Sequence, residues 1–81
     1  MQTIKVPRPK DLQAIFAKAK SDAEKNNISW SGDINQGSGS GFGFEGDYTV
    51  DDDSITVRVL KKPFWATKAR IEKEVKSYLS Q

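Results

Sequence analysis

Residues 42–60 alternate apolar and polar side chains on both sides of three consecutive aspartates, and this alternation constrains the fold more than any other feature. One set of alternating positions is apolar except for one glycine. It comprises Phe42, Phe44, Gly46, Tyr48 and Val50 before the aspartates and Ile55, Val57 and Val59 after them. A period of two is typical of strands with one buried face, and clustered aspartates favour a turn. We therefore predict an antiparallel hairpin of strands 42–50 and 55–60.

Two other segments carry the periodicity of amphipathic helices. In the first, apolar residues recur three and four positions apart, at Leu12, Ile15, Phe16, Ala19 and Ala23. Pro9 suits the first turn of this helix, and Asn26 and Asn27 suit a left-handed end, so we predict a helix at about 9–26. In the second, the same spacing occurs at Ile71, Val75, Tyr78 and Leu79. This helix is predicted to begin at Pro63 or a few residues later and to end near Leu79.

The remaining segments complete a predicted α+β two-layer sandwich. Residues 2–6 form a short N-terminal strand or arm, which prolines 7 and 9 end, and residues 28–31 form a short strand with Ile28 and Trp30 facing inward. The glycine-rich residues 32–41 are predicted to be a flexible loop. The expected order is an arm, a helix, a three-stranded antiparallel meander and a helix. Both helices are expected on one sheet face, in a single domain of residues 1–81.

Composition excludes several classes of function. The chain has 81 residues and neither cysteine nor histidine, so disulfides, thiol nucleophiles and imidazole acids, bases or metal ligands are excluded. The longest apolar runs are far shorter than the roughly 20 residues that cross a bilayer, and no apolar stretch typical of a secretory signal follows the first charges. We predict a cytoplasmic protein that is not an enzyme and has no catalytic residues, no cofactor and no metal site.

Three motifs that suggest chemistry have simpler structural explanations. Gly41, Gly43 and Gly46 match a dinucleotide-binding spacing, but they lie within a predicted strand and no helix opens on the last glycine. The aspartates at 51–53 lack the alternate spacing and distal glutamate of a calcium loop. Glu45 and Asp47 share the outward face of one strand, where nothing would tune one of them as an acid.

The aromatic residues divide into predicted core and predicted surface. Trp30, Phe42, Phe44 and Tyr48 could stack on bases, but so small a domain needs them in its core. Phe64 and Trp65 are adjacent at a helix start, so both cannot point in the same direction. We predict that this pair includes an exposed anchor for a partner.

Basic residues are concentrated toward both ends of the chain, while its middle is acidic. Residues 32–57 carry six acidic groups and no basic ones, against a net charge of +2 for the chain. The basic residues form a candidate strip, at Lys61, Lys62, Lys68, Arg70, Lys73 and Lys76. A helix, three strands and a lysine-rich helix are also the layout of double-stranded RNA-binding domains. Nucleic-acid binding through this strip is therefore the alternative function.

Nearly the whole chain resembles the polyhydroxyalkanoic acid system proteins, a family of small bacterial proteins. The resemblance is carried by residues 4–9 with Leu12, the alanine-containing first helix, Trp30, residues 53–59, residues 63–68, residues 71–75 and Leu79. It implies an accessory role at polyester storage granules, with no established reaction. The glycine-rich residues 37–43 depart from the family's pattern, as does the missing leucine-rich run before the last helix.

The sequence thus predicts a non-enzymatic accessory or binding module. Its expected partner is a granule surface or a granule protein, bound through Phe64 and Trp65. A homodimer that covers the open sheet face is a second option, because so small a core gains from added buried area.

Overall fold

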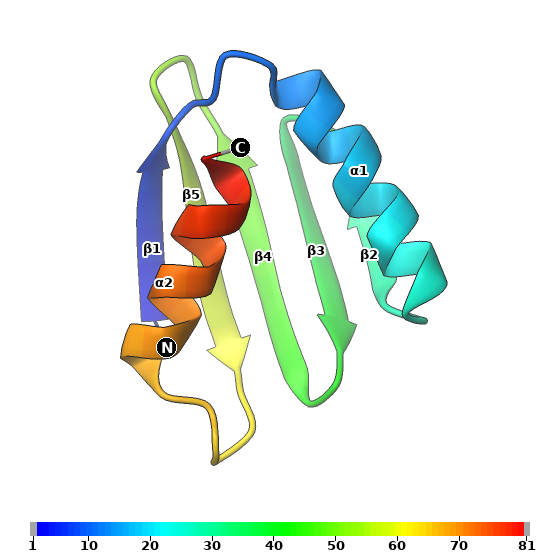
Figure 1. Cartoon of the computed structure of the whole chain (residues 1–81), viewed down its shortest axis with the longest axis vertical. Helices are drawn as coiled ribbons and strands as arrows, with labels where there is room; N and C mark the ends of the chain where they lie inside the picture. The colour runs from blue at the N-terminus through cyan, green and yellow to red at the C-terminus, as the bar shows by residue number, and fades with distance from the viewer. Residues whose placement is uncertain (1, 81) are drawn as a thin grey trace.

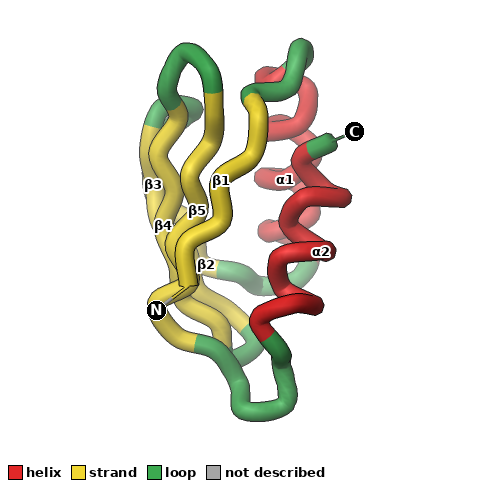
Figure 2. Tube along the Cα trace, turned by 90° about the vertical axis from the view of Figure 1, so that its left-hand side faces the viewer, coloured by secondary structure: helices red, strands yellow, loops and turns green. Residues whose placement is uncertain are grey.

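The computed structural model describes residues 2–80, which form one five-stranded antiparallel sheet and two helices (Figure 1). The elements in chain order are β1 (Gln2–Pro7), α1 (Leu12–Lys25), β2 (Ser29–Gly32), β3 (Gln36–Gly41), β4 (Phe44–Val50), β5 (Ser54–Lys61) and α2 (Lys68–Leu79). The α+β class is confirmed. Both helices lie on one face of the sheet, and the other face carries no helix (Figure 2).

The predicted three-stranded meander is wrong, because the sheet has five strands in the order β1-β5-β4-β3-β2. The four strands β2 to β5 follow one another as antiparallel hairpins. The first strand β1 returns to the opposite edge and pairs with β5, where Ile4 lies opposite Val57. The predicted arm is therefore an edge strand of the main sheet.

The fifth strand, β3, comes from the segment predicted to be a flexible loop. Its sequence alternates glycine and serine. The register pairs Gly37, Gly39 and Gly41 with the inward-facing residues of β4, so these glycines lie on the inner face of the sheet. Glycine is poor at holding a strand by itself, so composition alone favours a loop. Here Gly37 and Gly41 are covered by the side chains of Tyr48 and Ile28, and this packing across the sheet overrides the local preference.

The turn between β3 and β4 takes Phe42 out of the core that the sequence predicted for it. Phe42 and Gly43 both have positive φ angles, 54° and 85°, which is the pattern of a two-residue turn whose twist matches the strands. Such a turn projects its side chains beyond the sheet, and Phe42 is 68% exposed. Strand β4 therefore begins at Phe44 and not at Phe42.

Side-chain caps set the first residues of both helices, and α1 is shorter at its N-terminal end than predicted. The Asp11 carboxylate accepts the Ala14 N–H at 3.3 Å, so α1 begins at Leu12 and Pro9 lies outside it. The Thr67 hydroxyl accepts the Arg70 N–H at 3.2 Å, so α2 begins at Lys68. The left-handed end of α1 is confirmed at Asn27, whose φ is 56°.

The buried core lies mainly beneath α2 and the N-terminal half of α1, over β1 and β5. It consists of two clusters, one of Ile4, Ala66 and Ile71, and one of Val6, Leu12 and Ile55. The outer face of the sheet is polar, and one row across it runs through Thr3, Arg58, Asp47, Ser38 and Ser31. A polar face can remain in water, which explains why a single layer of helices suffices.

Candidate functional site

All large apolar side chains that residues 2–80 leave exposed lie near one end of the molecule. They are Phe64 at 97% exposure, Phe42 at 68%, Trp65 at 63% and Leu60 at 45%. We call these four residues the apolar tip. Single exposed apolar residues are common on proteins, but a group of them marks an interaction surface.

Two loops form most of the tip, the β3–β4 turn and the β5–α2 connection, which share one end of the sheet (Figure 1). They touch where a Cβ on Gly43 would lie 3.1 Å from the Pro63 ring. The Trp65 ring packs edge-on against Phe44, with centroids 5.9 Å apart. Both members of the predicted Phe64–Trp65 pair are thus exposed, but Trp65 rests against Phe44 whereas Phe64 projects freely.

Lysines lie beside the tip. Lys61 ends β5, and Lys62 donates its Nζ to the Ala66 carbonyl at 2.7 Å, which fastens the loop that carries Phe64 and Trp65. Lys68 begins α2 on the other side of this loop. The three aspartates at 51–53 are in the turn at the opposite end of β5, so the tip is the basic end of the hairpin.

The predicted basic strip does not form one continuous face along α2. Lys76 pairs with Glu72 at 3.8 Å, whereas Arg70 and Glu74 line a pocket between α2 and the sheet. Acidic residues thus alternate with the basic ones, and the positive charge is concentrated at the start of the helix.

Three aromatic side chains pack together beneath α1. The rings of Phe16, Trp30 and Tyr48 meet edge-on, with centroid distances from 5.3 to 6.1 Å. The indole of Trp30 donates to the Tyr48 hydroxyl at 3.1 Å, and this hydroxyl donates to the Asp33 carbonyl. Burial raises the pKa of Tyr48. This cluster confirms the predicted packing role of Trp30 and Tyr48.

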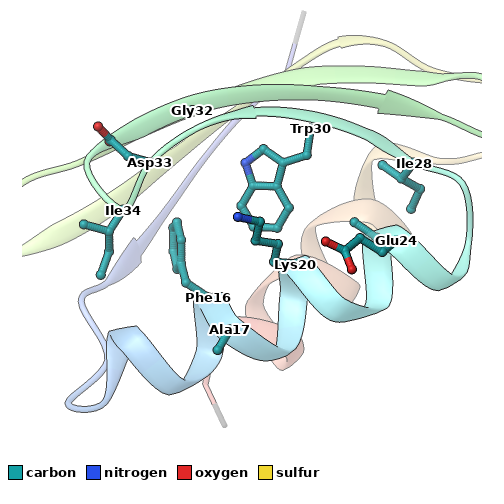
Figure 3. A pocket seen from close by; sticks show the side chains of 10 residues that line it. Phe16, Ala17, Lys20, Glu24, Ile28, Trp30, Gly32, Asp33 and Ile34 are labelled. Carbon is teal, nitrogen blue, oxygen red and sulfur yellow. The ribbon is translucent and has the colours of Figure 1, made fainter.

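A recess of about 340 Å³ lies between α1 and the β2 edge. Figure 3 shows Phe16 and Trp30 side by side in its lining, with Lys20 and Glu24 on the helix. One oxygen of the Asp33 carboxylate, Oδ1, accepts the N–H groups of Asn35 and Gln36, at 2.8 and 3.1 Å, and these bonds lower the pKa of Asp33. Asp33 thereby closes the turn between β2 and β3 that borders the recess.

Two further pockets lie between the helices and the sheet. One, of about 480 Å³, is bordered by α2 and by Phe44, Val59 and Trp65. The other, of about 270 Å³, is bordered by both helices and by Trp30 and Tyr48. Their linings are largely apolar, which is typical of small-molecule sites.

Two of the acidic groups that the sequence singled out, Asp51 and Asp47, have structural roles. The Asp51 carboxylate accepts the N–H groups of Asp53 and Ser54, at 2.9 and 2.7 Å, and closes the predicted turn. Asp47 forms a two-pronged ion pair with Arg58, which lowers the pKa of Asp47. Within residues 2–80 no three acidic residues group as a metal ion would require.

Neither α1 nor α2, the helices of the described residues, has the length and hydrophobicity to cross a bilayer. Comparison with protein-family models, with curated proteins and with solved structures gives no match to this chain. The case for function therefore depends on surfaces and cavities. Sequence reasoning missed Phe42 and Leu60 at the tip. The turn that exposes Phe42 has phenylalanine at a position of positive φ where asparagine, aspartate or glycine is usual, so only Gly43 gave a local signal for it.

Proposed function

We propose that the chain is a non-enzymatic binding module that docks on a hydrophobic surface through its apolar tip. The surface that we propose is the polyester of a storage granule. The observation that carries this proposal is the exposure of Phe64, 97%, on a loop fastened at both ends. A side chain so exposed makes little contribution to folding, and its burial against an apolar phase would gain about 2 kcal/mol.

The shape of the tip favours a surface over a small ligand. Phe42 and Phe64 project from two loops at the end of the molecule, where a ligand would find no walls. A projecting apolar group gains most by insertion into a deformable phase. This reasoning agrees with the sequence resemblance, which supplies the granule as the surface.

The nearby lysines suit a surface that carries anionic groups as well as apolar ones. Lys61, Lys62 and Lys68 lie beside the tip, and each cation close to an anionic surface adds attraction that salt screens. The apolar contribution should depend little on salt, so the two contributions can be separated.

The test is co-sedimentation of the purified protein with polyhydroxybutyrate particles at low and at high salt. Phe64→Ser is the decisive variant, because Phe64 is the most exposed residue of the tip and its loss should leave the fold intact. We expect salt-resistant binding by the wild type and a loss of at least ten-fold in Phe64→Ser. Lys73→Ser, on α2 and away from the tip loops, is the control and should bind as the wild type does.

Equal sedimentation of Phe64→Ser and the wild type would refute docking by the tip. If no protein sediments and the wild type instead binds double-stranded RNA with a steep salt dependence, the lysines beside the tip carry the function. Loss of that RNA binding on replacement of Lys61 and Lys62 would establish the alternative.

A further inference from the structure

The middle of the sheet is the part of the interior that the molecule's own side chains fill least. Helix α1 packs on β2 at one edge and α2 packs on β1 at the other, and Figure 1 shows β4 between them. Within residues 29–50, which hold β2, β3 and β4, no residue is fully buried. The interior beneath the helices therefore retains free space.

The floor of this space is a pair of glycines. Gly39 and Gly46 lie directly opposite each other on β3 and β4. A Cβ on Gly39 would meet only the main-chain oxygen of Ser29 within 4 Å, at 3.0 Å, and the three atoms nearest to a Cβ on Gly46 all belong to the main chain of β5. Unlike Gly37 and Gly41, this pair has no side chain lying close over it.

Both pockets between the helices and the sheet reach this floor, one at both glycines and the other at Gly46 alone. Gly46 and Val57 line the inner pocket of about 270 Å³ and also the outer pocket of about 480 Å³. The two pockets therefore adjoin at these residues, and their volumes are close to the range typical of ligand sites, about 300 to 1,000 Å³. The outer pocket borders Trp65, and the inner pocket ends against Ile15, Ile55 and Leu79.

The two helices are bridged at the inner pocket, which limits the thickness of an occupant. The Tyr78 hydroxyl of α2 donates to the Asp22 carboxylate of α1 at 2.9 Å, and the Lys18 ammonium lies 4.8 Å from the centre of the Tyr78 ring. A strand or helix of a second protein would have to break this bridge. A single linear chain can enter from the outer pocket without breaking it.

The charges at the outer pocket do not favour an ionic ligand. Arg58 and Glu45 belong to the outer-facing positions of β5 and β4, and Arg58 is neutralised there by Asp47. The charged residues of α2 that line the pocket are Arg70 and Glu74. One cation beside one carboxylate gives a carboxylate ligand no net attraction. The apolar walls likewise leave a buried charge without a partner.

We propose that the space floored by Gly39 and Gly46 binds one uncharged linear aliphatic chain per molecule, of the class of medium-chain alcohols and esters. Burial of the chain covers apolar side chains that the fold leaves half-buried, and this supplies the affinity. The inference stands apart from docking by the tip, because it depends on the interior and not on Phe64.

The test is titration of the protein with 1-decanol, followed by tryptophan fluorescence and by calorimetry. Trp30 lines the inner pocket and Trp65 the outer one, so both report on filling. Ala19→Leu fills the inner pocket, and Ala14→Leu makes the same change at an exposed position of α1 that lines neither pocket. We expect saturation at one decanol per chain, at least ten-fold weaker binding in Ala19→Leu and unchanged binding in Ala14→Leu.

A second pair of variants tests the glycine floor. Gly39→Val places a side chain on the floor, and Ser40→Val makes a β-branched replacement on the outer face of the same strand. Only Gly39→Val should weaken binding, again by at least ten-fold. Absence of saturable binding, or equal weakening by both members of each pair, would overturn the proposal.

Two comparisons complete the design. Tighter binding of decanoate than of 1-decanol would overturn the assignment to an uncharged ligand. Phe64→Ser should bind decanol as the wild type does even where it no longer sediments with polyester. Failure of docking by the tip and failure of the interior site therefore give different results.

Discussion

Trp30 donates its indole N–H to the Tyr48 hydroxyl, at 3.1 Å, and thereby joins the edge strand β2 to β4 across the glycines of β3. The same hydroxyl donates to the Asp33 carbonyl in the β2–β3 turn. The Tyr48 side chain thus links β4 to β2 and to the β2–β3 turn, across a strand whose inner face carries only glycines.

We expect Tyr48→Phe to lower the free energy of unfolding by about 1 kcal/mol, because the indole N–H loses its acceptor and the Asp33 carbonyl loses a donor. The ring and its contacts with Phe16 remain. Urea unfolding followed by circular dichroism measures the change. A stability equal to that of the wild type would show that water replaces the phenol at no cost.

Gly37→Ala should destabilise the fold because Tyr48 occupies the place of the new methyl group. A Cβ there would lie 2.5 Å from the Tyr48 hydroxyl and 2.7 Å from the main-chain oxygen of Ser31. Overpacking of this kind costs about 1 to 3 kcal/mol. Ser38→Ala, on the outer face of the same strand, is the control and should change stability by no more than about 0.5 kcal/mol. Equal unfolding midpoints for the two variants would contradict this account.

Strand β5 offers a matched pair that tests where the core lies. Ile55 is 2% exposed and Leu60 is 45% exposed. Ile55→Ala should cost about 2 to 5 kcal/mol, the range for loss of a large buried side chain, whereas Leu60→Ala should cost less than about 1 kcal/mol. The measurement is again urea unfolding. Similar losses for both would mean that the tip contributes to folding and is not a free surface.

The helices and the hairpin could be predicted because their signals are local. The spacing of Ile71, Val75 and Leu79 gives α2 its inward face whatever surrounds it, and the alternation of β5 does the same for Ile55 and Val57. The places where the helices begin depended on the caps Asp11 and Thr67. These residue types were visible in the sequence, but the proline signals at 9 and 63 competed with them.

Strand β3 and the pairing of β1 could not be predicted by the same reasoning. Gly37 and Gly41 lie in a strand because the side chains of Tyr48 and Ile28, from other segments, pack over them. The local composition of residues 36–41 does not reveal this packing. The partner of β1 is β5, which lies about 50 residues away in the sequence. Only part of the candidate tip could be predicted. Phe64 and Trp65 are neighbours in the sequence, whereas the pairing of β3, β4 and β5 is needed to bring Phe42 to the same end of the molecule.

Asp51→Asn should reduce the dependence of stability on acid. The N–H groups of Asp53 and Ser54 lower the pKa of Asp51 below its usual 3.8, so at pH values between the lowered pKa and 3.8 the unfolded chain binds more protons. The resulting stability is fully present above 3.8 and is lost as pH falls through the folded pKa.

Urea midpoints between pH 6 and pH 2 measure this effect. Asp51→Asn keeps a side-chain oxygen that accepts the same N–H groups but removes the titration, so its decline with acid should be shallower than that of the wild type. Asp52→Asn removes the same charge one position away and is the control. An equally steep decline for Asp51→Asn and the wild type would refute the role of Asp51.

Tyr78→Phe should raise the pKa of Asp22. The Tyr78 hydroxyl is the main cause of the low pKa of this carboxyl, and its hydrogen bond with Lys18 is the next. Removal of the hydroxyl leaves the ring in place and the Lys18 ammonium near the carboxylate, so the pKa should move toward 3.8 without reaching it.

A titration of the Asp22 carboxyl by carbon-13 NMR gives this pKa directly, and Lys18→Met gives the matched comparison. We expect a larger rise in Tyr78→Phe than in Lys18→Met, because the tyrosine bond contributes more. Because Asp22 stabilises the fold only above its folded pKa, Tyr78→Phe should also weaken the acid dependence of unfolding. An unchanged Asp22 pKa in Tyr78→Phe would mean that the helices are not bridged in solution, and the space between them would then be open to thicker occupants.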